Sequence, residues 1–176
     1  MPPAESAGVP AEAAPFDPAA VVAVLQAHHV RFVVIGGFAA LAHGSPFPTE
    51  DIDITPATDV ANLTRLSAAL RAMAARIRTE GVPEGLAFAH DAASLAARET
   101  WNLVTAHGDL DLALRPAGTR GYADLVRGAR DVEALGVTIP IASLADVIRS
   151  KQAANRPKDQ RVLPTLRRIL AEHPDD

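Results

Sequence analysis

The stretch Gly36–Ile54 (GGFAALAHGSPFPTEDIDI) decides the fold of this chain. Just before it, Arg31–Ile35 (RFVVI) is β-branched and almost wholly apolar, which is typical of a strand buried on both faces. The glycine pair ends that strand, and the small residues of Phe38–Ala42 predict a short helix that packs closely. Gly44 ends the helix, a proline-bearing loop follows, and Asp51–Ile54 predicts a second strand.

Alternation along Asp51-Ile52-Asp53-Ile54 places both carboxylates on one face of this strand and both isoleucines on the other. Like charges about 7 Å apart repel each other, so the pair favours a place where a cation or solvent screens it. Mg²⁺ suits such a place because it takes one or two carboxylates together with substrate phosphate oxygens. The pattern predicts a metal-dependent phosphoryl-transfer site, and the alternative is an exposed strand edge with two solvated acids.

The glycine pair Gly36-Gly37 lies where free backbone N–H groups at a helix start can receive a phosphate. Plain turn chemistry is the alternative, because glycine relieves strain in any tight bend from strand to helix. The position just upstream of Asp51 favours phosphate binding.

A second acidic alternation, Asp109-Leu110-Asp111-Leu112, lies on a later strand with its leucines toward the core. One of its acids is a candidate third metal ligand, or a base that takes the proton from an attacking hydroxyl. Asp111 is favoured because it lies deeper in the strand. The alternative is a turn acid at Asp109 and a solvated acid at Asp111.

Length and composition indicate one helix-rich α/β or α+β domain, since 48% of the 176 residues are hydrophobic and only 4% aromatic. Residues 1–16 are rich in Pro, Ala and Glu and predict a flexible arm, which leaves 17–172 as the domain. The further predicted elements are a helix from Asp17 to Ala27, an amphipathic helix from Asp59 to Arg76, a hairpin of Trp101–Thr105 and Asp109–Leu114, a strand at Val137–Ile141, a helix from Ser143 to Ala154, and a last helix from Pro157 that Pro164 should kink or divide.

The absence of cysteine excludes disulfides, thiolate metal sites and cysteine nucleophiles, so any metal must be held by oxygen or imidazole. No apolar run is long enough to span a bilayer, and the start lacks the order of a signal peptide. We therefore expect a cytoplasmic protein without a membrane partner.

The net charge of −4 hides a basic C-terminal segment. Between Arg149 and Arg168, the lysines and arginines are opposed by Asp159 alone. Such a segment can be a structural counter-charge, a grip for polyphosphate or a solvated helix face, and charge by itself does not choose among these.

The combined order of motifs resembles the nucleotidyltransferase superfamily, and within it the AbiEii-like and MenT-like toxin branch. The resemblance runs from about Val33 to Leu170 and rests on Gly36–Ile54 together with GDLDLALRPAG (Gly108–Gly118) and SKQAANRPKDQ (Ser150–Gln160). It implies a nucleotidyltransferase fold, a single α/β (α+β) domain in which helices flank a mixed sheet.

The resemblance also implies a role for each motif residue. It implies a phosphate-binding turn at Gly36 and Gly37, a Mg²⁺ site (with Mn²⁺ as a substitute) on Asp51, Asp53 and Asp111, catalytic roles for these acids and Lys151, and contacts to a nucleoside triphosphate from Lys151, Arg156 and Lys158. If the family resemblance is set aside, the simpler interpretation of Lys151, Arg156 and Lys158 is a solvated helix face.

The activity implied by the resemblance is transfer of a nucleoside monophosphate from the triphosphate to an acceptor hydroxyl. By resemblance to the toxin branch, the acceptor is the 3′ end of a tRNA, the protein is the toxin of a toxin–antitoxin pair, and a cognate antitoxin protein is its partner. A small molecule, as in aminoglycoside nucleotidyltransferases, or a protein side chain is an alternative acceptor. A binding protein that kept the fold without the chemistry is a further alternative.

At Phe47 the chain departs from many relatives, which carry an arginine two residues before the threonine of T-x-D-I-D. His43 is close enough to the glycines in sequence to touch substrate, although a hydrogen-bonded structural histidine is the more common role. Trp101 and Phe88 are expected in the core, so the chain offers few exposed rings for stacking on bases.

Overall fold

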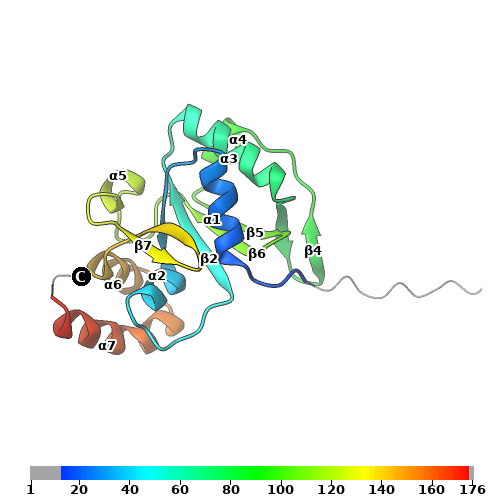
Figure 1. Ribbon diagram of the computed structural model, residues 1–176. Coiled ribbons are helices and arrows are strands. Elements are labelled where there is room, and N and C mark those ends of the chain that lie inside the picture. The colour runs from blue at the N-terminus through cyan, green and yellow to red at the C-terminus, as the bar shows by residue number, and fades with distance from the viewer. Residues whose placement is uncertain (1–12, 175–176) are drawn as a thin grey trace, which may run out of the picture.

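The computed structural model describes residues 13–174 and shows an eight-stranded mixed sheet flanked by helices (Figure 1). The strand order is β4-β3-β5-β6-β2-β1-β8-β7. The strands are β1 (Phe32–Ile35), β2 (Asp51–Pro56), β3 (Arg76–Thr79), β4 (Val82–Leu86), β5 (Thr100–Thr105), β6 (Gly108–Ala113), β7 (Arg130–Ala134) and β8 (Val137–Ile141). The helices are α1 (Pro18–Ala27), α2 (Gly36–Ala42), α3 (Val60–Ala72), α4 (Ala92–Ala96), α5 (Tyr122–Leu125), α6 (Leu144–Ala154) and α7 (Pro157–Glu172).

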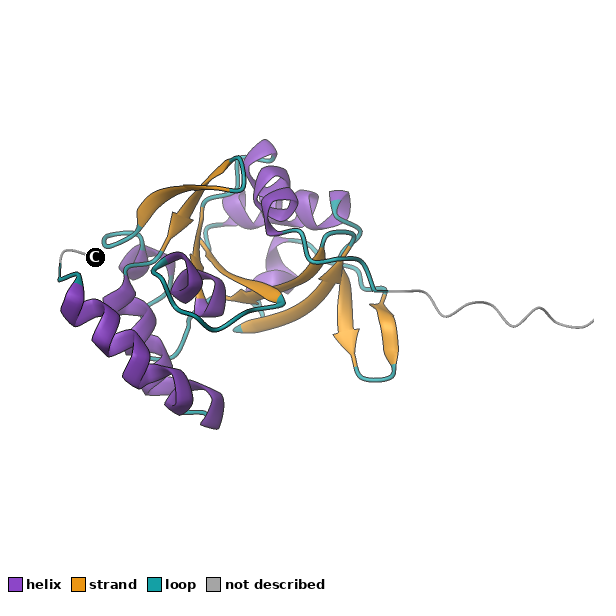
Figure 2. Ribbon diagram, turned by 60° about the horizontal axis from the view of Figure 1, so that its bottom comes forward, coloured by secondary structure: helices purple, strands orange, loops and turns teal. Residues whose placement is uncertain are grey.

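The helices other than α5 form two groups with strands between them (Figure 2). In the first group α3 contacts β2, and both α1 and α4 contact α3. In the second group α2 contacts β2 and α6, and α7 packs against α6. The central strands lie between these layers, where Val33, Ile52 and Leu110 are fully buried.

The two strands that carry the acidic alternations are neighbours. β2 pairs in parallel with β6, with Asp51 opposite Asp109 and Asp53 opposite Asp111. On its other side β2 pairs antiparallel with β1. A parallel pair needs a long crossover, and here α3, β3, β4, α4 and β5 all lie between the two strands in sequence.

Local signals at helix starts match the structure. The Asp17 carboxylate accepts a hydrogen bond from the N–H of Ala20 at 3.0 Å, and Pro18 is the first residue of α1. The Ser143 hydroxyl accepts one from the N–H of Asp146 at 3.1 Å and so caps α6. The predicted fold class, a mixed sheet with flanking helices, is confirmed.

The predicted helix from Asp59 to Arg76 is too long. α3 ends at Ala72, and Ala74 adopts a positive φ of 51° that turns the chain back. Arg76–Thr79 is β3, which pairs with β5. Alanine and arginine favour helix locally, but pairing with an existing strand overrides that preference.

Pro164 does not divide the last helix, contrary to one of the two outcomes expected of it. α7 runs from Pro157 to Glu172 without a break. Proline removes one backbone hydrogen bond here, but Leu163 and Leu166 on either side are buried and anchor both halves to the core.

The sequence patterns missed both edge strands, β4 and β7. β4 (VPEGL) contains proline and glycine, and β7 (RDVEA) is largely charged. Neither carries the apolar alternation that marks a strand, because an edge strand has one partner and is largely exposed to solvent. The short helices α4 and α5 were missed as well.

Residues 1–12 of the predicted N-terminal arm lie outside the described residues. Phe16, at the end of that predicted arm, meets Phe38 edge-to-face with 6.5 Å between ring centroids. Ordered packing therefore begins before residue 17. Within residues 13–174, no helix combines the length and apolar character that crossing a bilayer requires.

Candidate functional site

A cleft of about 760 Å³ opens between the acid-bearing face of the sheet and residues of α2, α6 and α7. It is lined by every residue to which the family resemblance assigned a role, namely Gly36, Gly37, Asp51, Asp53, Asp111, Lys151, Arg156 and Lys158. Phe47, Thr49, Asn102 and Arg115 line it too. Folding thus brings the glycine turn, the acids and the C-terminal cations to one place.

Alternation along β2 separates the acids from the core. Ile52 and Ile54 are fully buried, whereas Asp51 and Asp53 are partly exposed toward the cleft. On β6, the side chain of Asp111 is 16% exposed and that of Asp109 is 37% exposed. Asp111 is the deeper acid and lines the cleft.

Gly36 makes room for Asp53. Its φ of +71° is a left-handed conformation that favours glycine, and an added Cβ would lie 2.2 Å from Asp53 Oδ2. The neighbouring Gly37 is less restricted, because its added Cβ would lie 3.2 Å from Thr49 Oγ1. Position 36 is therefore glycine because the backbone there lies directly against the Asp53 carboxylate.

The pKa of Asp53 is raised to about 7, first by burial and then by the charges of Asp51 and Asp111. Lys151 and Lys158 act in the opposite direction without outweighing these causes. Such a carboxyl group lacks enough positive charge nearby, and a bound cation would supply it.

Thr49 orients the first acid of the pair. Its hydroxyl donates to the Asp51 carboxylate at 3.0 Å and lies 3.1 Å from the Asp51 carbonyl oxygen. The threonine of the T-x-D-I-D motif therefore fixes the start of β2 and the side chain of Asp51 together.

Arg78 on β3 is a site residue that the sequence reasoning missed. Its guanidinium forms ion pairs of 2.7 Å with both Asp109 and Asp111. Burial raises the pKa of Asp111, although the charge and hydrogen bond of Arg78 lower it in part. The alternation in RIRT, with Arg76 and Arg78 on one strand face, was the available signal, but the predicted helix extended to Arg76 and no strand was predicted after it.

The acids fit a divalent cation as a pair. Asp51 and Asp53 share one face of β2, and the raised pKa of Asp53 marks a charge that a hard cation would stabilise. Asp111 is held by Arg78, and among residues 13–174 no group of three His, Asp or Glu side chains is arranged to hold a metal ion. Asp111 would have to share or leave Arg78 to become a ligand.

Lys151 and Arg156 are held beside the cleft by one buried carboxylate. Lys151 Nζ lies 3.5 Å from Asp159 Oδ1, and Arg156 Nε lies 2.7 Å from Asp159 Oδ2. Burial would raise the pKa of the fully buried Asp159, but hydrogen bonding from Arg156 and the two positive charges lower it. Lys158 is exposed and has no ion pair with another residue of the described chain.

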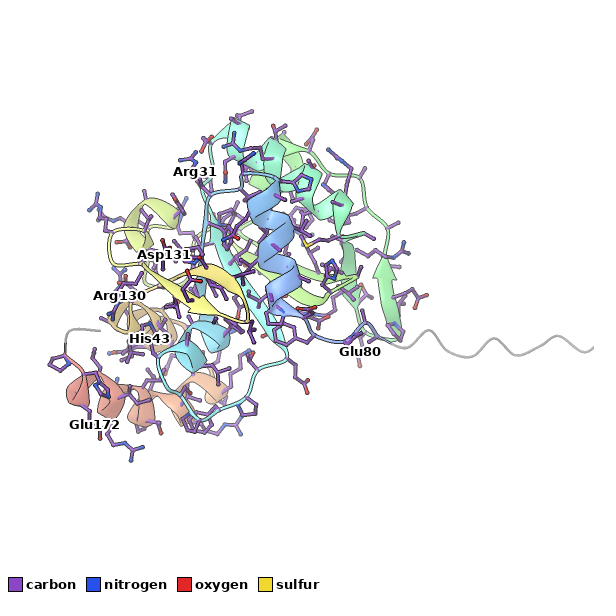
Figure 3. The ribbon with its side chains drawn as sticks, viewed as in Figure 1. Arg31, His43, Glu80, Arg130, Asp131 and Glu172 are labelled. Atoms are coloured by element: carbon purple, nitrogen blue, oxygen red, sulfur yellow. The ribbon has the colours of Figure 1, made fainter. Side chains whose placement is uncertain are left out.

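His43 has a structural role in this arrangement. Its Nε2 is 2.8 Å from the carbonyl oxygen of Ala142, which joins the end of α2 to the segment after β8 (Figure 3). It does not line the cleft. His43 is therefore a hydrogen-bonded structural histidine, the more common of the two roles considered for it.

No protein-family model and no curated protein sequence matches this chain. Solved structures match its fold. The lincosamide antibiotic adenylyltransferase LnuA, bound to lincomycin, superposes with a TM-score of 0.57 at 13% identity, over 86% of this chain and 95% of LnuA. The solution structure of the antibiotic-resistance factor ANT(2'')-Ia superposes with a TM-score of 0.54 at 15% identity, over 86% of this chain and 80% of that one.

A crystal structure of ANT(2'')-Ia with adenylyl-2''-tobramycin gives a TM-score of 0.52 at 15% identity, over 86% of this chain and 84% of that one. These superpositions show a shared fold. Because the sequence identities are low, the activity has to be argued from the site. The chain therefore has the nucleotidyltransferase fold, the fold that the lincosamide adenylyltransferase also has.

Proposed function

We propose that this protein transfers a nucleoside monophosphate from a nucleoside triphosphate to an acceptor hydroxyl. The observation that carries the proposal is the cleft itself, where the Asp51 and Asp53 carboxylates face a glycine turn and the cations of α6 and α7. A triphosphate needs both positive charge and a metal-binding carboxylate pair, and this cleft offers both.

Asp51 and Asp53 would hold Mg²⁺ or Mn²⁺, with Thr49 fixing the orientation of Asp51. Bound there, the metal supplies charge neutralisation to the triphosphate and lowers the pKa of an acceptor hydroxyl. Lys151 and Lys158 would contact the phosphates. Asp159 keeps Lys151 in position for that contact.

Asp111 would accept the proton of the acceptor hydroxyl, with Arg78 fixing its carboxylate. The acceptor oxygen forms a bond to the α-phosphorus, the bond from that phosphorus to the bridging oxygen breaks, and pyrophosphate leaves. Arg156 and the glycine turn would stabilise charge on the phosphates during this exchange.

The proposed acceptor is the 3′ end of a tRNA, which would make the protein the toxin of a toxin–antitoxin pair of the AbiEii-like and MenT-like branch. The support, besides the resemblance in sequence, is the basic stripe of α7, which we define as Lys158, Arg161 and Arg168. All three are exposed and unpaired within residues 13–174, and Lys158 reaches the cleft. Exposed cations beside an active site suit a polyanionic acceptor.

A small hydroxylated molecule is the second candidate acceptor. The observation in its favour is the fold match to LnuA in its lincomycin-bound form and to ANT(2'')-Ia with adenylyl-2''-tobramycin. A small acceptor would not need the basic stripe, so the two candidates differ in their dependence on α7 and on salt.

The deciding experiment incubates the purified protein with Mg²⁺, each α-labelled nucleoside triphosphate, and either total tRNA, lincomycin or tobramycin. Asp53→Ala is the inactive control, and Glu80→Ala, an exposed acid outside the cleft lining, is the matched control. Label on tRNA that is lost only in Asp53→Ala supports the toxin proposal and identifies the nucleotide.

Label on an antibiotic alone would replace tRNA by a small acceptor. No label on any acceptor, with no rise in melting temperature when Mg²⁺ and triphosphate are added together, would favour a non-catalytic protein that kept the fold. Growth arrest on expression, relieved by Asp53→Ala, tests the toxin role in cells.

A further inference from the structure

Phe47 is exposed where the other aromatic side chains are packed. It is 40% exposed and lines the cleft. Elsewhere Phe32, Phe38 and Trp101 are buried, Phe88 stacks on Trp101 at 5.5 Å between ring centroids, and Phe16 and Tyr122 are partly buried against the core. An aromatic ring exposed at a cleft offers a flat apolar surface on which a ligand can pack.

The loop around Phe47 is built to present the ring rigidly. Pro46 and Pro48 flank it, and proline fixes its own φ and restricts the residue before it to extended conformations. Downstream, the Thr49 hydroxyl is bonded to Asp51. The ring is therefore displayed on a stiff support, so little conformational entropy would be lost when a ligand packs on it.

The surroundings of Phe47 select a flat ligand attached to an anion. Pro48 and Val162 add apolar surface to the cleft lining, and Lys158 adds a positive charge to it. The glycine turn, the loop from α2 to β2 and the start of α7 all contribute to the lining of this one cleft. A nucleobase with phosphates beside it matches this combination of an apolar surface and a cation.

The position across the sheet favours the nucleotide over the acceptor. The acceptor must reach Asp111 on β6, and beyond it lies Asn102 on β5. Phe47, by contrast, lies in the loop that leads from α2 into β2, and this loop continues through Thr49, which is hydrogen-bonded to the proposed metal ligand Asp51. We propose that Phe47 is the stacking surface for the base of the bound nucleoside triphosphate, an inference that rests on the proposed function.

Stacking alone accepts any base, since every base has a flat face. Phe47 is therefore expected to set the strength of nucleotide binding and to leave the choice of base to other contacts.

The test compares Mg²⁺-dependent binding of ATP and of inorganic tripolyphosphate, which has the phosphates but no base, by titration calorimetry. Phe47→Ala is expected to weaken ATP binding at least about fivefold and to leave tripolyphosphate binding unchanged. Leu41→Ala is the matched control, because Leu41 is also 40% exposed but lies outside the cleft lining. It should leave both affinities unchanged.

A second variant, Phe47→Trp, gives a direct signal of stacking. Its indole fluorescence should be quenched by ATP and not by tripolyphosphate, against the background of the buried Trp101. Equal ATP affinity in the wild type and Phe47→Ala, or a loss confined to the KM of the acceptor, would overturn the stacking proposal and leave nucleotidyl transfer in place. A wild-type protein that binds neither ligand would overturn both.

Discussion

Asp53 lies against Gly36, with Asp51 on its own strand and Asp111 directly opposite on β6. At the scale of single residues, the contact with Asp53 explains why the first residue of α2 is glycine, and burial together with the charges of Asp51 and Asp111 raises the pKa of Asp53. A site that crowds carboxylates together loses stability in exchange for the ability to bind a cation.

The pKa of Asp53 predicts a pH-dependent gain from Asp53→Asn in metal-free protein. The folded-state pKa of about 7 lies above the ordinary value of 3.8, so the folded protein keeps a proton that the unfolded chain has lost between these values. The stability from this proton falls as pH rises through that window. Asp53→Asn should therefore raise the melting temperature more at about pH 8 than at about pH 5.

Thermal melts in a chelator at both pH values provide the check, with Glu50→Gln as a control for a neighbouring exposed acid. A gain that is larger at the lower pH would contradict the electrostatic account.

Gly36→Ala should abolish metal-dependent nucleotide binding as well as lower stability. The added Cβ would lie 2.2 Å from Asp53 Oδ2, and the positive φ adds backbone strain of about 1–2 kcal/mol. Gly44→Ala is the control for strain alone, since Gly44 has a φ of +93° and no atom within 4 Å of an added Cβ. Chemical denaturation and calorimetry of both variants separate the two causes. Equal effects in the two variants would show that the contact with Asp53 is unimportant.

Two elements outside the glycine–acid motif complete the site. β3 lies beyond β5 from β6, and Arg78 on β3 pairs with the acids of β6. The first turn of α7 carries the buried Asp159, which pairs with two cations. The local sequence of neither element predicts that it contributes to the site. Arg78 lies on a strand that was not predicted, just beyond the end of the predicted helix, and Asp159 lies in a basic segment whose charge did not decide between a structural counter-charge, a polyphosphate grip and a solvated face.

Arg78→Ala is expected to lower the nucleotidyl-transfer rate by roughly tenfold, because Asp111 loses the group that orients it. Arg76→Ala is the matched control: Arg76 is on the same strand, and its Nε donates to the Gly85 carbonyl oxygen at 3.1 Å. Steady-state kinetics of both variants test this. A smaller effect from Arg78→Ala than from Arg76→Ala would exclude a positioning role for Arg78.

Asp159→Ala should cost about 3 kcal/mol of unfolding free energy, since it leaves the poorly exposed Lys151 ammonium without its counter-ion. Glu99→Ala removes an exposed ion pair with Arg115, at 3.9 Å, and should cost less than about 1 kcal/mol. Urea denaturation of the two variants measures both values. If the two variants lost similar amounts of unfolding free energy, the buried ion pairs of Asp159 would stabilise the fold no more than the exposed pair of Glu99.

At the scale of the whole molecule, the cleft lies where distant parts of the chain meet. The glycine turn comes from the first third of the sequence, Asp111 from the middle and the cations from the last helices. The overall charge is negative, yet the basic stripe of α7 leaves one exposed cationic surface beside the acids. That asymmetry is a property of the assembled fold.

The double variant Arg161→Ala/Arg168→Ala tests the acceptor at this scale. With tRNA as acceptor, labelling should fall, and the slope of log affinity against log salt should decrease by about 0.7–0.9 for each lost phosphate contact. Arg120→Ala/Arg127→Ala removes the same charge from exposed positions around α5 and should change neither. An unchanged salt slope in the α7 variant would favour a small-molecule acceptor.

Short-range patterns determined much of the fold and most of the candidate site. Asp17 and Ser143 mark helix starts through contacts three residues away, and the alternation in Asp51–Ile54 separates cleft from core through strand geometry. These features are encoded locally, so the sequence alone was enough to predict them.

Only the tertiary structure decided which strands are neighbours and which charges meet. The parallel pairing of β2 with β6 sets Asp53 opposite Asp111, and β3 then brings Arg78 to the same acid. The end of α3, the edge strands and the burial of Asp159 were likewise settled by packing. The physical reason is that these contacts join segments far apart in the chain, whose pairing depends on the free energy of the whole core and has no local signature.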